Sequence, residues 1–285
     1  MWKEGSRVNF KRIEIIFLVT FIAIDIFLFG MFEQNMSMQT ENVSQGDSDS
    51  KIVKEMKDDQ INVGSLSNKT SFAYYLSGTQ NDTLRSQMGQ LLNQTPHYVG
   101  HELDSEFKEP VTVSQNNPQS SIAKLMDNPT FVLYGDQYAY SKDLSTAKSI
   151  VFVQKAMNGL IYSTEAQVRF NLNANHQIVS YTQSYLQDVK SLREKSETIS
   201  ETRALIWLYQ YNEIPNNTKV VWSKLAYTKL LSIDTDRVFI PTWVIAIKPQ
   251  NSPQVQLKKI NAFTGGIIKE TNENLKNAQS ISGDN

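Results

Sequence analysis

Hydrophobic residues are most concentrated near the N-terminus, where residues 13–32 read IEIIFLVTFIAIDIFLFGMF. A helix rises about 1.5 Å per residue, so this stretch is about 30 Å long, which matches the hydrocarbon thickness of a bilayer. We therefore predict a transmembrane helix over residues 13–32. A cleaved signal peptide is the alternative, but its apolar region is shorter and ends at a small-x-small site. The sequence FGMF at 29–32 offers no such site.

Charged residues are distributed unequally on the two sides of this stretch. Four basic residues precede it: Lys3, Arg7, Lys11 and Arg12. Acidic residues follow it, with no basic residue before Lys51: Glu33, Glu41, Asp47 and Asp49. Basic residues remain on the cytoplasmic side of a membrane helix, so we predict a cytoplasmic tail over 1–12 and an extracytoplasmic C-terminal domain. The chain is then a single-pass protein of the cell membrane.

Two acidic residues interrupt the apolar stretch. Asp25 lies well inside it, where a charged Asp costs about 2.5–3.5 kcal/mol on insertion scales. Glu14 precedes Asp25 by about three helical turns, so both acids share one face with Leu18 and Phe21. One interpretation is that Glu14, Leu18, Phe21 and Asp25 bind the transmembrane helices of a partner. The other is that a strongly apolar anchor tolerates an acid, and the spacing favours neither.

Polar residues dominate residues 33–71, which are rich in Ser, Asn, Gln, Asp and Lys. Such a segment buries too little apolar surface to offset its ordering entropy, so we predict a flexible extracytoplasmic tether there, with room for a short helix around residues 52–56. Residues 272–285 predict a disordered tail for the same reason. Residues 72–271 carry helix and strand patterns and predict an α+β extracytoplasmic domain, with subdomains at roughly 72–144 and 145–271.

The domain pattern predicts two successive units, each a helix followed by antiparallel strands. Helical signals cover residues 82–92, 145–158 and 198–214, and the last begins with a capping box formed by Thr198 and Glu201. Strand signals cover residues 161–172, 177–185, 220–233, 238–247 and 255–262. Residues 131–140 predict a hairpin that turns at Gly135-Asp136.

Composition excludes several kinds of chemistry. The net charge is −1 and no cysteine is present, so the sequence offers no basic field for nucleic acid, no disulfide and no thiolate site. His97 and His101 have a spacing that could bind zinc on a helix, but Pro96 and Gly100 oppose a helix there. Asp234 and Asp236 fit a turn better than a cation site. We predict no catalytic residue, no cofactor and no metal.

Four segments together carry a family resemblance. They are residues 9–17 (NFKRIEIIF), 25–29 (DIFLF), 239–247 (FIPTWVIAI) and 260–267 (INAFTGGI). In these segments the sequence resembles the YycI (WalI) family of Gram-positive bacteria, accessory regulators of the two-component system that controls cell-wall metabolism. The last segment also resembles the strand and turn of PepSY-type modules.

The resemblance implies a regulator that catalyses no reaction. Its transmembrane helix is expected to contact the sensor histidine kinase YycG (WalK), and its outer domain is expected to pair with a YycH (WalH) homologue. Two alternatives stay open. A ligand-binding or scaffolding domain of the cell envelope requires a deep apolar pocket with a few polar groups. An anchored cell-wall enzyme requires a carboxylate pair or a Ser/His constellation.

Overall fold

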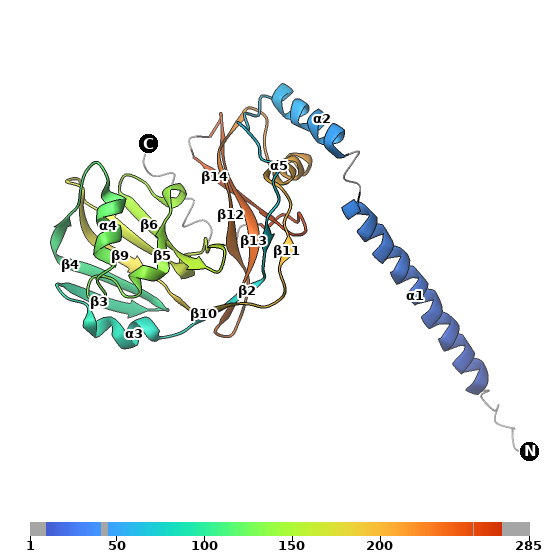
Figure 1. Ribbon diagram of the computed structural model, residues 1–285, viewed down its shortest axis with the longest axis horizontal. Coiled ribbons are helices and arrows are strands. Elements are labelled where there is room, and N and C mark those ends of the chain that lie inside the picture. The colour runs from blue at the N-terminus through green and yellow to red at the C-terminus, as the bar shows by residue number, and fades with distance from the viewer. Residues whose placement is uncertain (1–9, 41–44, 253, 270–285) are drawn as a thin grey trace, which may run out of the picture. The chain divides into compact units, whose positions relative to one another are not determined.

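The computed structural model describes residues 10–40, 45–252 and 254–269 (Figure 1). The chain divides between Ile52 and Val53 into two compact units. The predicted cytoplasmic tail lies outside the described residues as far as residue 9, and the predicted tail over 272–285 lies wholly outside them.

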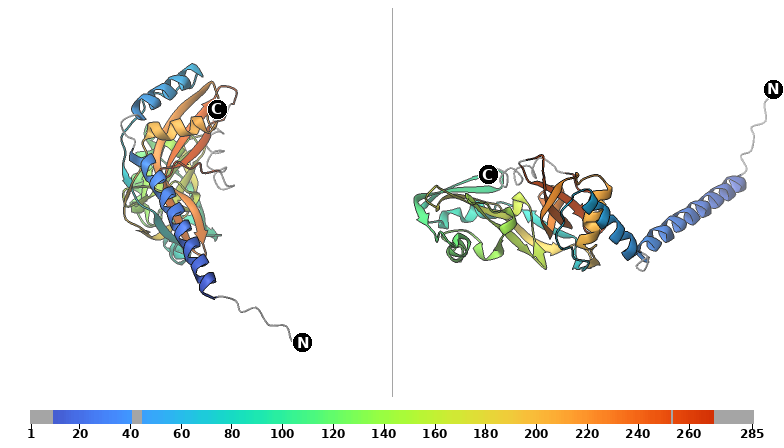
Figure 2. Two further views of the ribbon diagram at one scale, coloured as in Figure 1. Left: turned by 90° about the vertical axis from the view of Figure 1, so that its right-hand side faces the viewer. Right: turned by 90° about the horizontal axis from the view of Figure 1, so that it is seen from above.

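The first unit contains the long helix α1 (Phe10–Thr40), which Figure 2 shows as one continuous helix. Its segment Ile13–Met31 is 19 residues long and has a mean hydropathy of 2.4, which suits it to cross a membrane. The helix extends beyond the predicted end at Phe32, and Glu, Gln and Met in this extension favour helix. Part of the predicted tether is therefore helical.

The second helix and the segment after it also differ from the predicted tether. Helix α2 spans Gln45–Asp58, and its Met56 is buried together with Ile61 and Val63. The backbone of Asn62 accepts a hydrogen bond from Val220 at 2.8 Å and donates one to Thr218 at 2.8 Å. The prediction of a flexible segment is thus wrong from Val53 onward, because a few well-spaced apolar residues and backbone bonds to a strand order a segment of polar composition.

A five-stranded sheet forms one part of the second unit. Its strands are β2 (Leu76–Gln80), β10 (Leu186–Ser191), β12 (Thr218–Ile233), β13 (Asp236–Pro249) and β14 (Gln256–Asn261). The order is β10-β2-β13-β12, β14 also pairs with β13, and every pair is antiparallel. Helix α5 (Glu201–Gln210) packs Ala204, Leu205 and Leu208 against Ile245 and Ile247 of β13 (Figure 1).

Pro241 lies within β13 although proline cannot donate a ladder hydrogen bond. Beside this position the neighbouring strand changes from β2, which pairs with 236–239, to β14, which pairs with 242–247. The carbonyl of Pro241 faces that side and accepts from Ala262 N at 2.9 Å. Its missing N–H therefore falls between two partner strands, where no ladder bond is lost.

A seven-stranded antiparallel sheet is inserted between β2 and β10. Its strands are β3 (Gln94–Val99), β4 (Glu102–Thr112), β9 (Gln177–Gln183), β8 (Gln167–Leu172), β6 (Ser149–Ala156) and β5 (Tyr138–Tyr140) in this order, with β7 (Gly159–Leu160) beside β6. Helix α4 (Pro118–Met126) packs Ile122 and Met126 on a core that includes Phe152, Phe170 and Tyr181. The α+β class with antiparallel sheets, predicted from the sequence, is confirmed.

The predicted helix over 145–158 is wrong, because most of this segment is strand β6. Ile150 and Phe152 face the core under α4, whereas Val151 and Val153 face the five-stranded sheet through Val244 and other residues. A strand buried on both faces reads as an unbroken apolar run, which periodicity does not separate from a helix.

The predicted hairpin over 131–140 is also wrong. Residues 131–134 form turns, and Tyr134 adopts a φ of 51° before the 3-10 turn Gly135–Gln137, so only Tyr138–Tyr140 forms a strand. The boundary at 144/145 between subdomains does not hold either, because β5 pairs with β6 and β4 pairs with β9 across it.

The two remaining predicted helices are shorter than expected. Helix α3 spans only Thr83–Gln87 and continues as a 3-10 turn at Met88–Gln90. Helix α5 is capped by Ser200, whose hydroxyl accepts from Arg203 N at 3.2 Å, and not by Thr198. Thr198 instead accepts from Ser71 N at 3.2 Å, which joins it to the short sheet of β1 (Phe72–Ala73) and β11 (Ser196–Glu197).

Candidate functional site

The four residues of the predicted partner-binding face all lie in α1. Glu14, Leu18, Phe21 and Asp25 follow one another at spacings of four, three and four residues, so they occupy an arc of about 60° around the helix axis. All four side chains are exposed. The helix therefore places them in one stripe, with an acid near the start of the apolar segment and another within it.

The polar groups within this apolar segment are satisfied to different degrees. The hydroxyl of Thr20 donates to the Ile16 carbonyl at 2.8 Å, so its hydrogen bond stays inside the helix. Asp25 has no hydrogen bond or ion pair within the described part of the chain. In a bilayer, its carboxyl group has to find a polar partner on another molecule or be protonated.

A partly buried ion cluster joins the two sheets of the second unit. Glu165, from the turn before β8, lies with Oε1 3.0 Å from Arg237 Nε and with Oε2 3.2 Å from Lys229 Nζ. The contact with Lys229 is an ion pair whose geometry falls short of a hydrogen bond. The three side chains are 15%, 12% and 18% exposed respectively, so one carboxylate holds strands β13 and β12 to the inserted sheet.

The histidines considered for zinc lie on a strand and a turn, not on a helix. His97 is in β3, and His101 lies in the turn to β4, where its Nδ1 is 3.3 Å from Asp82 Oδ1. Tyr98 donates to the same Asp82 oxygen at 3.1 Å. Burial and this hydrogen bond raise the pKa of Tyr98 to about 12. The described residues contain no group of three or more His, Cys, Asp or Glu arranged to hold a metal ion.

The acidic pair at the tip of the β12–β13 hairpin has structural roles. The carboxylate of Asp236 accepts from the Thr79 hydroxyl at 2.8 Å, and the Asp234 carbonyl accepts from Arg237 at 2.9 Å. Asp234 has a φ of 50°, a conformation that suits the turn. The pair therefore ends the hairpin and ties it to β2.

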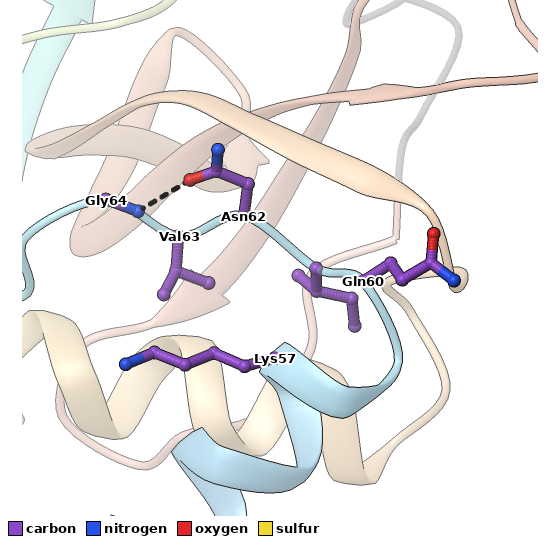
Figure 3. Close-up of a pocket in the computed structure, with 6 residues that line it drawn as sticks. Lys57, Gln60, Asn62, Val63 and Gly64 are labelled. Atoms are coloured by element: carbon purple, nitrogen blue, oxygen red, sulfur yellow. Dashed lines mark hydrogen bonds between the residues drawn. The ribbon is translucent and has the colours of Figure 1, made fainter.

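One pocket of about 320 Å³ lies beside the end of α2 (Figure 3). Its lining comes from a single stretch of chain: Lys57, Gln60, Ile61, Asn62, Val63 and Gly64. Asn62 Oδ1 accepts from Gly64 N at 3.2 Å and shapes the turn, and Figure 3 shows the Lys57 side chain extended past Val63. Lys57 lies in the last turn of α2, where the helix dipole already favours a cation. This is not the deep apolar pocket that a ligand-binding domain requires.

The family model of the YycI protein matches residues 39–263. The chain belongs to the YycI family. This membership implies a role in the WalK/YycG two-component system, and the family is one of regulatory accessory proteins. The apolar segment of α1 supports a single-pass membrane anchor for this YycI protein.

Two solved structures are similar to this YycI chain. An uncharacterized protein from Eubacterium rectale aligns at 9% identity and a TM-score of 0.47, over 73% of this chain and 89% of that one. The YpeB C-terminal domain of Bacillus megaterium aligns at 14% identity and a TM-score of 0.35, over 78% and 95% respectively. Both TM-scores are below 0.5, so we draw no function from them. No curated protein matches the sequence.

Aromatic side chains of a folded domain either pack in its core or lie exposed, where they can form a protein interface. Trp207 and Trp243 pack against the core beneath α5, and Trp243 Nε1 donates to the Ile199 carbonyl at 3.0 Å. Tyr227 is buried between the sheets. Phe72, which sequence reasoning did not single out, is instead 55% exposed, whereas Ala73, the other residue of strand β1, is buried.

Proposed function

We propose that this chain is a membrane-anchored, non-catalytic regulator of the sensor histidine kinase YycG (WalK), which controls cell-wall metabolism. Its N-terminus is cytoplasmic and its folded domain is extracytoplasmic, as the distribution of basic residues around the apolar segment favours. The single observation that carries the proposal is Asp25, an acid in a membrane helix with no partner in the described part of the chain. Family membership supplies the system in which it acts.

A single helix regulates a kinase by binding one of two packings of the kinase's transmembrane helices better than the other. Helices in lipid gain no hydrophobic attraction for each other, so packing and polar contacts decide between the packings. A polar contact between helices contributes about 0.6–2 kcal/mol, which shifts a two-state population roughly 3- to 30-fold. The stripe of Glu14, Leu18, Phe21 and Asp25 supplies both kinds of contact.

The outer domain is proposed to pair with a YycH (WalH) homologue. What supports this is the size of the folded unit, the exposed apolar side chains on its surface and its family. The acids Asp234 and Asp236, which an enzymatic role could have used as a carboxylate pair, instead serve the hairpin.

The test of this proposal is Asp25→Leu in the full-length chain. It should leave membrane insertion intact while it weakens association with the kinase roughly 3- to 30-fold and changes target-gene output. Fluorescence energy transfer between tagged proteins in cells would measure the association, and a promoter reporter the output.

Thr20→Leu is the matched control, because it removes a polar group that is already bonded inside the helix and lies outside the stripe. Kinase association that is unchanged in Asp25→Leu would exclude Asp25 as the contact. A reporter fused after Asn285 tests topology separately, since activity of a cytoplasm-only reporter there would contradict the proposed orientation.

A further inference from the structure

An exposed apolar patch lies where β1 and β11 pair. Phe72, Met157 and Leu192 are 55%, 60% and 48% exposed. The three come from separate segments that hydrogen bonds bring together. Asn158 Nδ2 donates to the Phe72 carbonyl at 2.7 Å, and Leu192 N donates to the Tyr75 carbonyl at 2.8 Å. The segments that carry these exposed side chains are therefore adjacent in the fold.

Two cations lie on the aromatic rings of this patch. Arg193 Cζ is 5.8 Å from the centroid of the Tyr75 ring, and Lys195 Nζ is 5.4 Å from that of Phe72. Neither cation has a carboxylate partner among the described residues. The nearby acid Glu197 already accepts from the Thr70 hydroxyl at 2.6 Å. The patch thus places two cations over aromatic rings, one of them the exposed ring of Phe72.

The composition of this patch is that of a protein interface. Aromatic residues, Met and Arg are enriched in the cores of such interfaces, and a contiguous exposed apolar patch marks an interaction site. Val99, at the end of β3, is an exposed apolar residue outside the patch. The two cations select for an acidic partner, because opposite charges steer association and like charges oppose it.

We infer that the patch of Phe72, Tyr75, Met157, Leu192, Arg193 and Lys195 is the surface through which the outer domain binds its partner domain. The partner's contacting surface carries Asp or Glu around an apolar group. This inference rests on the proposed function, since it assigns a surface to the proposed pairing between outer domains.

The experiment uses the full-length chain and the full-length YycH homologue of the same bacterium, both purified in detergent. Phe72→Ala and the double variant Arg193→Glu/Lys195→Glu should each raise the Kd at least about tenfold, as truncation of an aromatic anchor does. Added salt should weaken the wild-type complex and affect the double variant less. Val99→Ala and Lys108→Glu/Lys124→Glu are the matched controls, which alter exposed residues outside the patch and should leave the Kd unchanged.

The outcomes separate the two proposals. Binding that is equally tight in the wild type and the patch variants would overturn the patch while the pairing stands. An absence of binding by the wild-type chain would overturn the pairing and the patch with it, whereas the Asp25→Leu test of kinase contact would be unaffected. Self-association of the wild-type chain in sedimentation, lost in Phe72→Ala, would make a second copy the occupant and overturn the acidic partner.

Discussion

Asp25, in an apolar helix, and Glu165, between two sheets, are both carboxylates, but the chain supplies partners for only one of them. Glu165 is held between two cations from strands that are distant in sequence. Asp25 lies in a single apolar helix that brings no cation to it in the described residues. A folded domain can supply the partner of a buried charge from its own chain, whereas a lone membrane helix cannot. The unsatisfied acid is therefore the one expected to need another protein.

The largest expected effect concerns Glu165. Glu165→Gln removes the carboxylate shared by Lys229 and Arg237 and leaves two like charges close together in a partly buried place. Breaking a fully buried ion pair costs about 3–5 kcal/mol, so the free energy of unfolding of the domain should fall by up to about that amount. Urea unfolding of the full-length chain, followed by tryptophan fluorescence, measures it.

Lys224→Gln is the control for Glu165→Gln. Lys224 is 49% exposed and lies 4.0 Å from Asp143, so the loss of this pair should cost less than about 1 kcal/mol. If both variants lowered the free energy of unfolding by the same amount, the partners of Glu165 would stabilise the domain no more than an exposed ion pair does. That result would contradict the comparison between Glu165 and Asp25.

Two glycines sharpen the contrast between the folded domain and the lone helix α1. Gly265 has a φ of 69°, and a Cβ there would lie 1.6 Å from an atom of the Trp207 ring, whereas a Cβ on Gly30 of α1 would meet nothing within 4 Å. Gly265→Ala should therefore lower the free energy of unfolding of the domain by about 2–4 kcal/mol, through strain and overpacking.

Gly30→Ala should leave the unfolding of the domain unchanged and favour the helix slightly. Thermal melting of both variants, with circular dichroism for the helix, makes the measurement. A neutral Gly265→Ala would mean that Trp207 has room to move away.

The smallest expected effect concerns the polar network of Tyr98 and Asp82 at the surface. The pKa of Tyr98 is raised from 10.0 in the unfolded reference to about 12, so its contribution to stability is complete below pH 10 and is lost as the pH rises through about 12. The stability difference between the wild type and Tyr98→Phe should therefore narrow between about pH 10 and about pH 12.

Unfolding at a series of alkaline pH values tests this narrowing. Burial also raises the pKa of Tyr138 and Tyr181, but this background is common to both proteins and cancels in the difference. If the stability difference between the wild type and Tyr98→Phe stayed constant with pH, the hydrogen bond from Tyr98 to Asp82 would be excluded as the source of that difference.

The candidate sites differ in how far the sequence predicts them. The stripe of Glu14, Leu18, Phe21 and Asp25 follows from helical spacing alone, and α1 places all four on one face. The patch around Phe72 does not follow from any local pattern, because residues 72–75 and 192–195 meet only through the pairing of β1 with β11. Aromatic content indicates that interfaces are possible, but exposure is decided by what packs next to each ring.

Sequence alone determined the elements that are apolar on all sides or that have one buried and one exposed face. The apolar segment of α1 is long and apolar enough to cross a bilayer, so length and composition were enough to predict it. The long strands β12 and β13 and the helix α5 also followed from their local patterns. Only the tertiary structure decided that Ser149–Ala156 is a strand, because two cores bury both its faces and erase the period of two. It likewise decided that Met56, Ile61 and Val63 leave the predicted tether and join a core, since that core is built from residues far along the chain.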